Sequence, residues 1–277
     1  MSAFAGREVL LTGAAGGIGG ALASDLALAG ARPWLVDRDA PALEALASRL
    51  APAGAQATVC DLSRPEERRG VAAAISSGER RVDVLVLAAG STVVAPFEEV
   101  SEADYDEVFQ VNFGSALDLV RAAYPHMVRR GEGAIVAVGS IAGLVSQPLT
   151  HPYVAAKHAL AGLMKGLQHE ARARGVRLTL ACPGYVDTRM FHRARVVGVP
   201  PEKLYAALKA QPLRMVPPAA AARRILRDAA RGRFLSVFPL HARAYLWLYQ
   251  LHAEWALALA GRLVGVYEAL RRGGDGP

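Results

Sequence analysis

Tyr153 and Lys157 are the side chains in this sequence best placed to move a proton. They lie four residues apart in a stretch with a helical pattern, 153–173, so both fall on one face of the expected helix. A tyrosine is a poor base, because its unperturbed pKa is about 10. A lysine ammonium beside it stabilises the phenolate and lowers that pKa. The pair therefore predicts general acid–base chemistry on a hydroxyl or carbonyl group.

Ser140 is a third candidate for the same site. It follows a predicted buried strand, 133–138, and so lies at the carboxyl edge of a parallel sheet, where such sheets bind ligands. Its hydroxyl can hold a substrate oxygen. Each residue also has a purely structural interpretation: an exposed helix pair for Tyr153 and Lys157, and a helix cap for Ser140. Their occurrence together favours a reactive site.

A glycine-rich turn near the start of the chain predicts a site for nucleotide phosphates. A short apolar strand, 8–11, leads into the sequence TGAAGGIG, and a helical pattern follows. Glycines let the backbone turn tightly and approach a pyrophosphate, and the helix N-terminus offers unpaired N–H groups. Strand, turn and helix in this order are the context that the motif requires. The candidate contacts are Gly13, Gly16, Gly17, Ile18 and Gly19.

Asp37 ends the second predicted strand, 33–36, where its carboxylate can accept hydrogen bonds from both ribose hydroxyls of an adenine nucleotide. The same charge repels a 2′-phosphate, and Ala14 and Ala15 provide no cation to bind one. The sequence therefore favours NAD over NADP. Two alternatives stay open: the guanidinium of Arg38 can offset the repulsion, and Asp37 can instead cap the helix that follows.

Short apolar runs and longer helical stretches alternate along the chain. The predicted strands are 8–11, 33–36, 56–60, 82–87, 133–138, 176–182 and 234–237, and the predicted helices are 18–29, 40–50, 65–76, 105–130 and 153–173. Several strands are apolar throughout, as expected when both faces of a parallel sheet are covered. The alternation predicts a Rossmann-like, doubly wound α/β fold. Residues 1–238 are expected to form one domain that includes a lid, 189–218, and residues 239–277 a helical tail.

Composition excludes several classes of protein. The chain has 277 residues, 52% of them hydrophobic, which suits one large α/β domain. Cys60 and Cys182 are far apart and predict neither a disulfide framework nor a metal site, so a cytoplasmic location is expected. The N-terminus lacks the pattern of a secretory signal. The formal charge is +7, but no aromatic residues interleave with the basic clusters, so nucleic acid is not expected as a partner.

With these motifs, the chain resembles the short-chain dehydrogenase/reductase family in its compact single-domain form, from about Arg7 to Arg233. The resemblance depends on the order and spacing of residues 12–19, Asp61-Leu62, Asn112, Ser140, the segment 153–157 and the segment 183–188. It implies an oxidoreductase that interconverts a secondary alcohol and a ketone by hydride transfer with NAD(P). In that family Tyr153 corresponds to the acid/base, Lys157 to its pKa modifier and ribose ligand, Ser140 to the substrate holder, and Asn112 to a member of a proton relay.

The same resemblance implies further cofactor contacts. They are Pro183, Gly184, Val186 and Thr188 beside the nicotinamide, Asp61 and Leu62 beside the adenine, and Ala89 and Gly90 beside the adenosine ribose. Asp61 can alternatively cap the helix that begins at Pro65. Where the family usually has Asn-Asn-Ala-Gly, this chain has LAAG at 87–90, which puts the rigidity of that strand end in doubt. The helices 105–130 and 153–173 match those that pair between family subunits, so a homodimer or homotetramer is expected.

The tail, 241–272, is the second departure from the family. Its apolar side chains recur at three- and four-residue spacing and predict an amphipathic helix; they are Leu248, Leu251, Trp255, Leu259, Leu263, Val266 and Leu270. Three interpretations stay open. The tail packs on its own domain or a partner subunit, lies in a membrane interface, or walls an apolar substrate entrance beside the lid. The last two favour a lipid-like or steroid-like substrate.

A nucleotide-sensing binding protein without turnover is the alternative function. Such a protein is expected to have lost Tyr153 or Lys157, and this chain has both. The basic residues of the lid have two interpretations, as a site for an anionic acyl carrier or as solvated surface; they are Arg189, Arg193, Arg195, Lys203 and Lys209.

Overall fold

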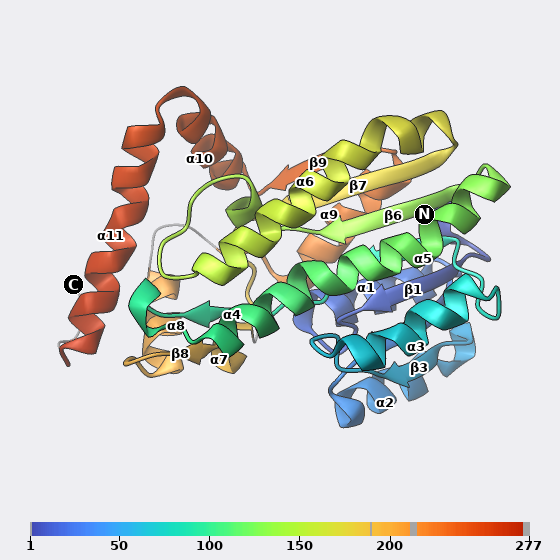
Figure 1. Ribbon diagram of the computed structural model, residues 1–277, viewed down its shortest axis with the longest axis horizontal. Helices are drawn as coiled ribbons and strands as arrows, with labels where there is room; N and C mark the ends of the chain where they lie inside the picture. The colour runs from blue at the N-terminus through green and yellow to red at the C-terminus, as the bar shows by residue number, and fades with distance from the viewer. Residues whose placement is uncertain (1, 189, 211–214, 274–277) are drawn as a thin grey trace.

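A computed structural model describes residues 2–188, 190–210 and 215–273 of the chain. Within them, seven parallel strands form one sheet in the order β3-β2-β1-β4-β6-β7-β9 (Figure 1). The strands are β1 (Glu8–Thr12), β2 (Arg32–Asp37), β3 (Gln56–Val59), β4 (Val84–Leu87), β6 (Gly133–Val138), β7 (Val176–Pro183) and β9 (Leu235–Phe238). The strand order reverses between β1 and β4. Sheets of this kind bind ligands at such a reversal, outside the carboxyl ends of the strands.

Helices cover both faces of this sheet, as its apolar strands require. One face carries α3 (Pro65–Ser76), α5 (Ser115–Arg130) and α6 (His151–Ala173), and the other carries α1 (Gly17–Leu28), α2 (Ala40–Arg49) and α9 (Pro218–Ala230). Successive side chains of β1 alternate between the two layers: Leu10 packs under α3 and α5, and Leu11 packs under α1 and α9. The predicted doubly wound α/β fold is confirmed.

The helix predicted at 105–130 is interrupted. It consists of α4 (Glu102–Phe109), a π-helical turn (Gln110–Gly114) and α5. The turn contains Asn112, which is 2% exposed and whose amide donates to the carbonyl oxygens of Ser91 and Val108, both at 2.8 Å. A π-turn widens the helix by one residue and often occurs at functional sites. Apolar periodicity predicts the helix but does not reveal such a local widening.

The segment after β7 forms a lid over the carboxyl ends of the strands. It contains α7 (Met190–Arg193), β8 (Arg195–Val196) and α8 (Pro201–Ala210), and β8 pairs in parallel with β5 (Val93–Val94). Arg189 and residues 211–214 of the predicted lid lie outside the described residues. Three lid cations form ion pairs with acids of the protein: Arg193 with Asp39, Arg195 with Asp104, and Lys209 with Asp187.

The tail is helical, as predicted, but it forms a hairpin of two helices, so its apolar side chains do not lie along one helix. Helices α10 (Leu240–Leu251) and α11 (Ala253–Arg271) meet at His252, whose φ of −143° and ψ of 73° are not helical (Figure 1). Leu251 and Trp255, on either side of this turn, are each 69% exposed, whereas Leu270 is buried. No proline or glycine marks the break, so the apolar spacing continues through it in the sequence.

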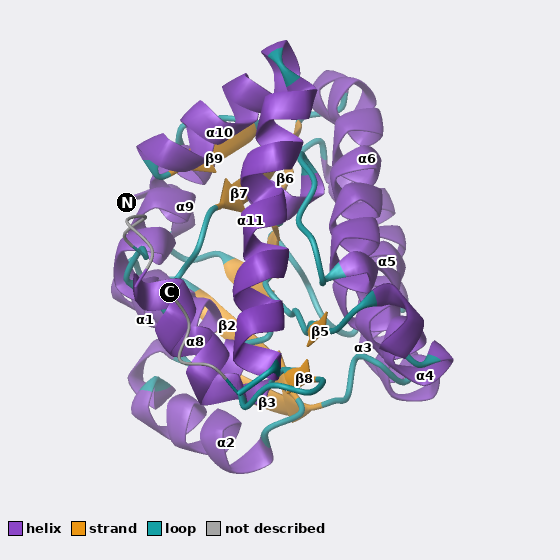
Figure 2. Ribbon diagram, turned by 90° about the vertical axis from the view of Figure 1, so that its left-hand side faces the viewer, coloured by secondary structure: helices purple, strands orange, loops and turns teal. Residues whose placement is uncertain are grey.

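The tail packs on its own chain, in agreement with the first of the three interpretations. Figure 2 shows α11 crossing in front of the sheet. Tyr267 is fully buried in a cluster with Val94, Val199 and Leu204, and its hydroxyl donates to the carbonyl oxygen of Val197. Arg271 makes two hydrogen bonds to Glu99, in a short 3-10 turn (Phe97–Glu99). No described helix has the length and hydropathy that a membrane crossing requires.

Candidate active site

One cavity of about 1050 Å³ at the carboxyl ends of the strands brings together the predicted site residues, with one exception. The exception is Asn112, which lies behind the cavity wall. The residues that line it are Gly13, Gly16, Gly17, Ile18, Gly19, Asp37, Arg38, Asp61, Leu62, Ala89, Gly90, Ser140, Tyr153, Lys157, Pro183, Gly184, Val186 and Thr188. The fold therefore places the glycine turn and the Tyr153–Lys157 pair in one site.

The glycine turn is packed so closely that side chains do not fit. Gly13 has a φ of +68°, and a Cβ atom there would lie 2.7 Å from the backbone of Ala89. A Cβ at Gly19 would lie 1.9 Å from the carbonyl oxygen of Gly13, and one at Gly17 would lie 2.9 Å from the side chain of Thr188. Helix α1 begins here, so its unpaired N–H groups lie at the cavity. This bare, N–H-rich turn fits a dinucleotide pyrophosphate.

The Thr12 side chain contacts the end of β4, where this chain has LAAG at 87–90 in place of the family's usual Asn-Asn-Ala-Gly. It is 1% exposed, and its Oγ1 accepts hydrogen bonds from the N–H groups of Ala88 at 3.1 Å and Ala89 at 3.3 Å. These bonds tie the end of β4 to β1 through a side chain of the neighbouring strand.

Asp37 presents its carboxylate to the cavity from the end of β2. Its two oxygens accept hydrogen bonds from the N–H groups of Ala15 and Asp39, each at 3.0 Å. Helix α2 is capped by Asp39, whose carboxylate accepts from the N–H of Ala42. The interpretation of Asp37 as a helix cap is therefore wrong. Its remaining lone pairs can accept ribose hydroxyls.

Arg38 is held by two acids beside this site. Its Nη1 lies 3.2 Å from Glu107 and 3.7 Å from Asp61. Asp61 also accepts hydrogen bonds from the N–H and the hydroxyl of Ser63, so it shapes the turn before α3 while it lines the cavity. Glu107 was not predicted, because an acid on the exposed side of a helix carries no signal in the sequence.

Burial determines the protonation of Tyr153. Loss of solvation of the phenolate raises the pKa of Tyr153 to about 12, and a hydrogen bond with Ser140 opposes this shift. In the protein alone, burial of the phenolate dominates this pKa. The lowering expected from the lysine together with a bound, positively charged nicotinamide stays a prediction. Tyr153 holds its proton at neutral pH and can donate it.

Lys157 is 3% exposed and occupies the floor of the cavity. Its Nζ donates to the carbonyl oxygen of Val138 at 3.0 Å and lies 5.6 Å from the ring centre of Tyr153. Burial lowers the pKa of Lys157 to about 8. Gly90 separates this ammonium from Asn112: a Cβ there would lie 3.1 Å from Asn112 Oδ1 and 3.8 Å from Lys157 Nζ. Asn112 Oδ1 has no hydrogen-bond partner within the described residues.

We expect Lys157→Met to stabilise the protein at neutral pH. The pKa of Lys157 falls from 10.5 in the unfolded chain to about 8 in the folded one. Between these values the unfolded chain binds more protons, so the unfolding free energy of the wild type rises with pH across that window. Below pH 8, removing the buried ammonium should raise the unfolding free energy by up to about 3 kcal/mol. That advantage should shrink as the pH approaches 10.5.

Urea unfolding at neutral pH and near pH 10 measures this difference. Lys165→Met, on the exposed side of α6, is the matched control and should change the unfolding free energy by less than about 0.5 kcal/mol. A loss of stability in Lys157→Met at neutral pH, or an equal gain at both pH values, would contradict the buried-charge account.

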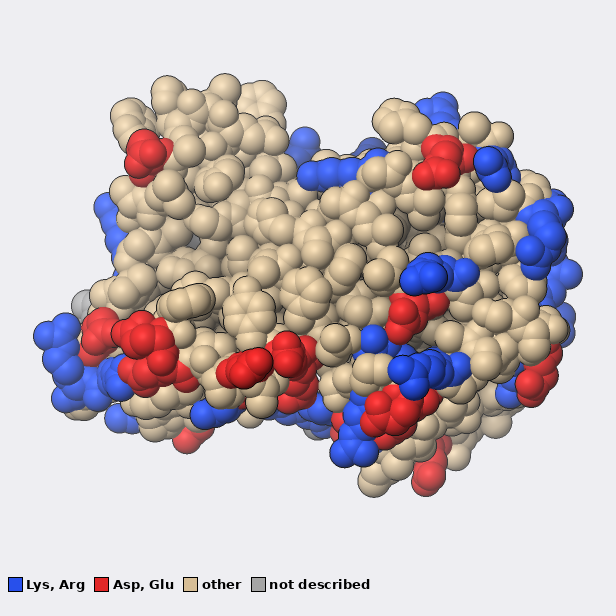
Figure 3. All heavy atoms as spheres, viewed as in Figure 1, with Lys and Arg blue, Asp and Glu red and all other residues tan. Residues whose placement is uncertain are grey.

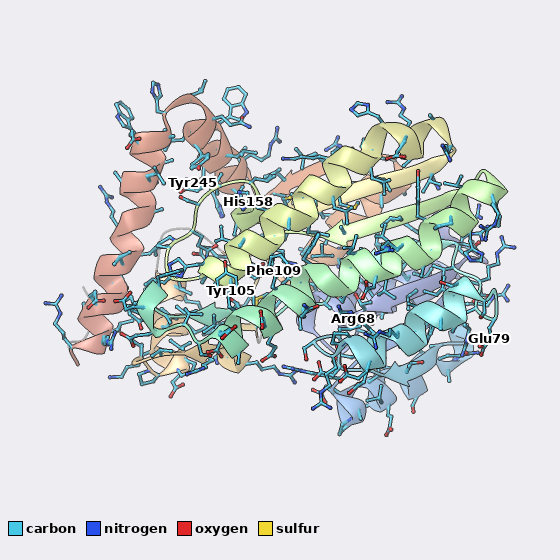
Figure 4. All side chains as sticks on the ribbon, in the orientation of Figure 1. Arg68, Glu79, Tyr105, Phe109, His158 and Tyr245 are labelled. Carbon is cyan, nitrogen blue, oxygen red and sulfur yellow. The ribbon has the colours of Figure 1, made fainter. Side chains whose placement is uncertain are left out.

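The tail supplies side chains that were not assigned to the site. Leu248 from α10 and Leu259, Leu263 and Val266 from α11 line the cavity. Tyr245, labelled in Figure 4, also lines it, and its hydroxyl donates to the carbonyl oxygen of Ala256, which ties α10 to α11. The tail therefore also walls the cavity, in agreement with the third interpretation. The three- and four-residue spacing of these apolar side chains is the signal from which that interpretation was made.

The chain is similar to known oxidoreductases. The model of the short chain dehydrogenase family matches residues 7–196. D-threitol dehydrogenase of Mycolicibacterium smegmatis is 37% identical over 191 residues, which cover 68% of this chain and 74% of that protein. A short chain dehydrogenase/reductase from Burkholderia phymatum in complex with NAD has a TM-score of 0.81 and 27% identity, and the match covers 92% of this chain and 96% of that one.

A short-chain dehydrogenase from Sphingobium yanoikuyae in complex with NADPH has a TM-score of 0.77 and 26% identity, with 91% of this chain and 94% of that one covered. The matched sequence spans the glycine turn and the Tyr153–Lys157 pair. The protein therefore belongs to the short-chain dehydrogenase/reductase family and is an NAD(P)-dependent oxidoreductase that acts on CH–OH groups.

Proposed function

We propose that this protein interconverts an apolar, lipid-like or steroid-like ketone and its secondary alcohol, and that it prefers NAD(H). The observation that carries the proposal is the shared cavity. Tyr153, Lys157 and Ser140 lie on its wall together with the glycine turn, and the tail contributes leucine and valine side chains to the same space. An apolar substrate can bury its body against the tail while its oxygen reaches the tyrosine.

Tyr153 is the proposed acid/base. Its protonated phenol donates to the substrate oxygen during reduction and takes the proton back during alcohol oxidation. Ser140 accepts a hydrogen bond from the N–H of Ala142 at 3.1 Å and is hydrogen-bonded to Tyr153, so its hydroxyl lies beside the acid/base, where it can hold the substrate oxygen. The bound nicotinamide supplies or accepts the hydride.

Lys157 and Asn112 are proposed to return the proton to Tyr153. The Lys157 ammonium is fixed by the carbonyl oxygen of Val138, close to the ring of Tyr153. The open acceptor of Asn112 lies on the far side of Gly90. A water bonded to Asn112 Oδ1 and to Lys157 would continue this chain of donors toward solvent.

The preference for NAD rests on Asp37. Its carboxylate lines the cavity at the end of β2, where we expect the adenosine ribose to bind, and Arg38, the cation beside it, is paired with Glu107 and Asp61. A 2′-phosphate would therefore meet a negative charge without a free positive one. One of the similar structures is a complex with NAD and another is a complex with NADPH, so similarity does not favour either cofactor. The proposed preference therefore depends on this chain's own residues.

We further propose that residues 1–238 form the catalytic domain and that residues 239–277 are an extension that closes the substrate end of the cavity. The four acids that line the cavity, Asp37, Asp61, Asp104 and Glu107, all come from the catalytic domain. The tail contributes no acid to the wall within the described residues. A homodimer or homotetramer through α5 and α6, in the cytoplasm, completes the proposal.

Leu263→Trp tests the assignment of the tail to substrate binding. Leu263 lines the cavity, so an indole in its place should fill space needed by a large substrate. We expect kcat/KM for long-chain and steroidal ketones to fall at least about tenfold, with little change for the shortest ketones. Val264→Trp is the matched control, because Val264 is 37% exposed and does not line the cavity. Equal losses for short and long ketones, or no loss, would contradict the assignment.

A further inference from the structure

Exposed apolar side chains are concentrated on the tail hairpin. Of the eleven large hydrophobic side chains exposed in the described residues, seven belong to α10 and α11: Leu240, Trp247, Leu251, Trp255, Leu257, Leu259 and Val264. Leu240 is 76% exposed. Single exposed apolar residues are ordinary, but a cluster on one element marks a contact surface.

The most exposed of these side chains surround the turn of the hairpin. Trp247 and Leu251 lie one turn apart near the end of α10, and Trp255 lies in the first turn of α11, with its ring stacked on that of His252 at 5.2 Å. Ala242 and Leu246, on the other side of α10, are buried. Figure 3 shows few charged side chains on the surface over this part of the molecule. We call Trp247, Leu251 and Trp255 the apolar tip.

The charges beside the apolar tip favour an anionic lipid surface as its partner. Arg243 lies one helical turn before Trp247 on α10, is exposed, and forms no ion pair within the described part of the chain. Arg262 on α11 is also exposed and without an ion pair there, and it lines the cavity. The described tail contains four arginines and two glutamates, and the whole chain carries a formal charge of +7. A second copy of this chain would bring another basic surface to these arginines. Anionic headgroups would pair with them instead.

The apolar tip also has the chemistry of interfacial helices. Indole rings prefer the headgroup region of a bilayer, and flanking arginines reach the lipid phosphates. Leu259 is 46% exposed and also lines the catalytic cavity, so the exposed face of the hairpin borders that cavity. A lipid-like substrate could therefore pass from a bilayer to the cavity without crossing water.

We propose that the α10–α11 hairpin docks this protein on the surface of an anionic bilayer, with the apolar tip in the headgroup region. The docking does not depend on the proposed reaction. Trp247, Leu251 and Trp255 do not line the cavity, so their loss leaves the reaction site intact. Docking and catalysis can therefore fail separately.

Flotation with vesicles tests the proposal on the full-length protein. Vesicles of phosphatidylcholine with about 30% phosphatidylglycerol should carry the wild type upward, and vesicles of phosphatidylcholine alone should bind it several-fold less. The double variant Trp247→Ser/Trp255→Ser should bind the anionic vesicles at least about tenfold more weakly. Leu28→Ser is the matched control: Leu28 is 84% exposed on α1, outside the tail, and its loss should leave binding unchanged.

Tryptophan fluorescence identifies the surface that makes contact. Of the three tryptophans, Trp34 is buried, and Trp247 and Trp255 are exposed. Their emission should shift to the blue and be quenched by brominated acyl chains when vesicles are added. Wild type that stays at the bottom with anionic vesicles, or a double variant that floats equally well, overturns the proposal. If the emission shifts to the blue without lipid, and more so at higher protein concentration, the apolar tip contacts a second copy of the chain. This result also overturns the proposal. Unchanged NADH binding by the double variant verifies its fold.

Discussion

Tyr153→Phe is expected to lower kcat for ketone reduction at least about a thousandfold, within the range that a positioned proton donor supplies. The substitution removes one oxygen. The ring keeps its packing in the cluster with Val93 and Val108, so the fold should be retained. The NADH dissociation constant should change only a few-fold. Loss of NADH absorbance measures turnover, and NADH fluorescence measures binding.

Tyr124→Phe is the control for removal of a buried hydroxyl. The Tyr124 hydroxyl is buried, has no hydrogen-bond partner within the described residues, and lies outside the cavity. This variant should keep the activity of the wild type. If Tyr153→Phe retains more than about a tenth of wild-type kcat, Tyr153 is not the acid that the proposal requires.

The pKa of Tyr153 sets the direction of the pH dependence. Burial raises that pKa to about 12, so the phenol is protonated at neutral pH. Reduction uses the protonated form and should not gain from a higher pH. Alcohol oxidation uses the phenolate and should become faster as the pH rises, until the phenol is ionised. Tyr153→Phe should remove this rise in oxidation rate.

Asp37→Ser is expected to abolish most of the discrimination between NADH and NADPH. A carboxylate about 5 Å from one phosphate charge costs roughly 3 kcal/mol at an effective dielectric constant of about 20, which is about a hundredfold in affinity. We therefore expect the wild type to bind NADH at least about a hundredfold more tightly than NADPH. Titration of both nucleotides by fluorescence measures the ratio. The serine can keep a hydrogen bond to one of the N–H groups that Asp37 accepts.

Asp39→Ser is the control for Asp37→Ser, because it removes a neighbouring carboxylate and leaves Asp37 unchanged. Asp39 caps α2 and pairs with Arg193, but it does not line the cavity. Serine is itself a good cap, so the change in stability should be small. The NADH preference should survive in this variant. A wild type that binds NADPH as tightly as NADH refutes the role given to Asp37.

The catalytic and nucleotide-binding residues could be predicted because their signals are local. Four-residue spacing on a helix places Tyr153 beside Lys157, and a strand end places Asp37 and Ser140 at one edge of a parallel sheet. The glycine turn needs only its own strand and helix. The cavity contains all of these residues together, as predicted.

The features that could not be predicted from the sequence depend on tertiary packing. Three such features leave no periodic signal in the sequence: the π-turn around Asn112, the pairing of Arg38 with Glu107, and the break at His252. The rise of the Tyr153 pKa in the protein alone could not be predicted either, because it comes from burial of the phenolate. The tail's apolar spacing left three interpretations open, among them a wall of the substrate entrance, and only the tertiary structure shows which of its side chains line the cavity and which face outward.

Deuterium transfer to ketones of graded size tests the central claim most directly. NADH labelled at its reactive carbon is offered with ketones from short and polar to long-chain and steroidal, and products are analysed by mass spectrometry. The account predicts deuterium on the carbinol carbon and a kcat/KM that rises with apolar size. A preference for short polar ketones would contradict the substrate class. NADH binding without labelled alcohol from any ketone would contradict the proposed reaction and favour a nucleotide-sensing binding protein.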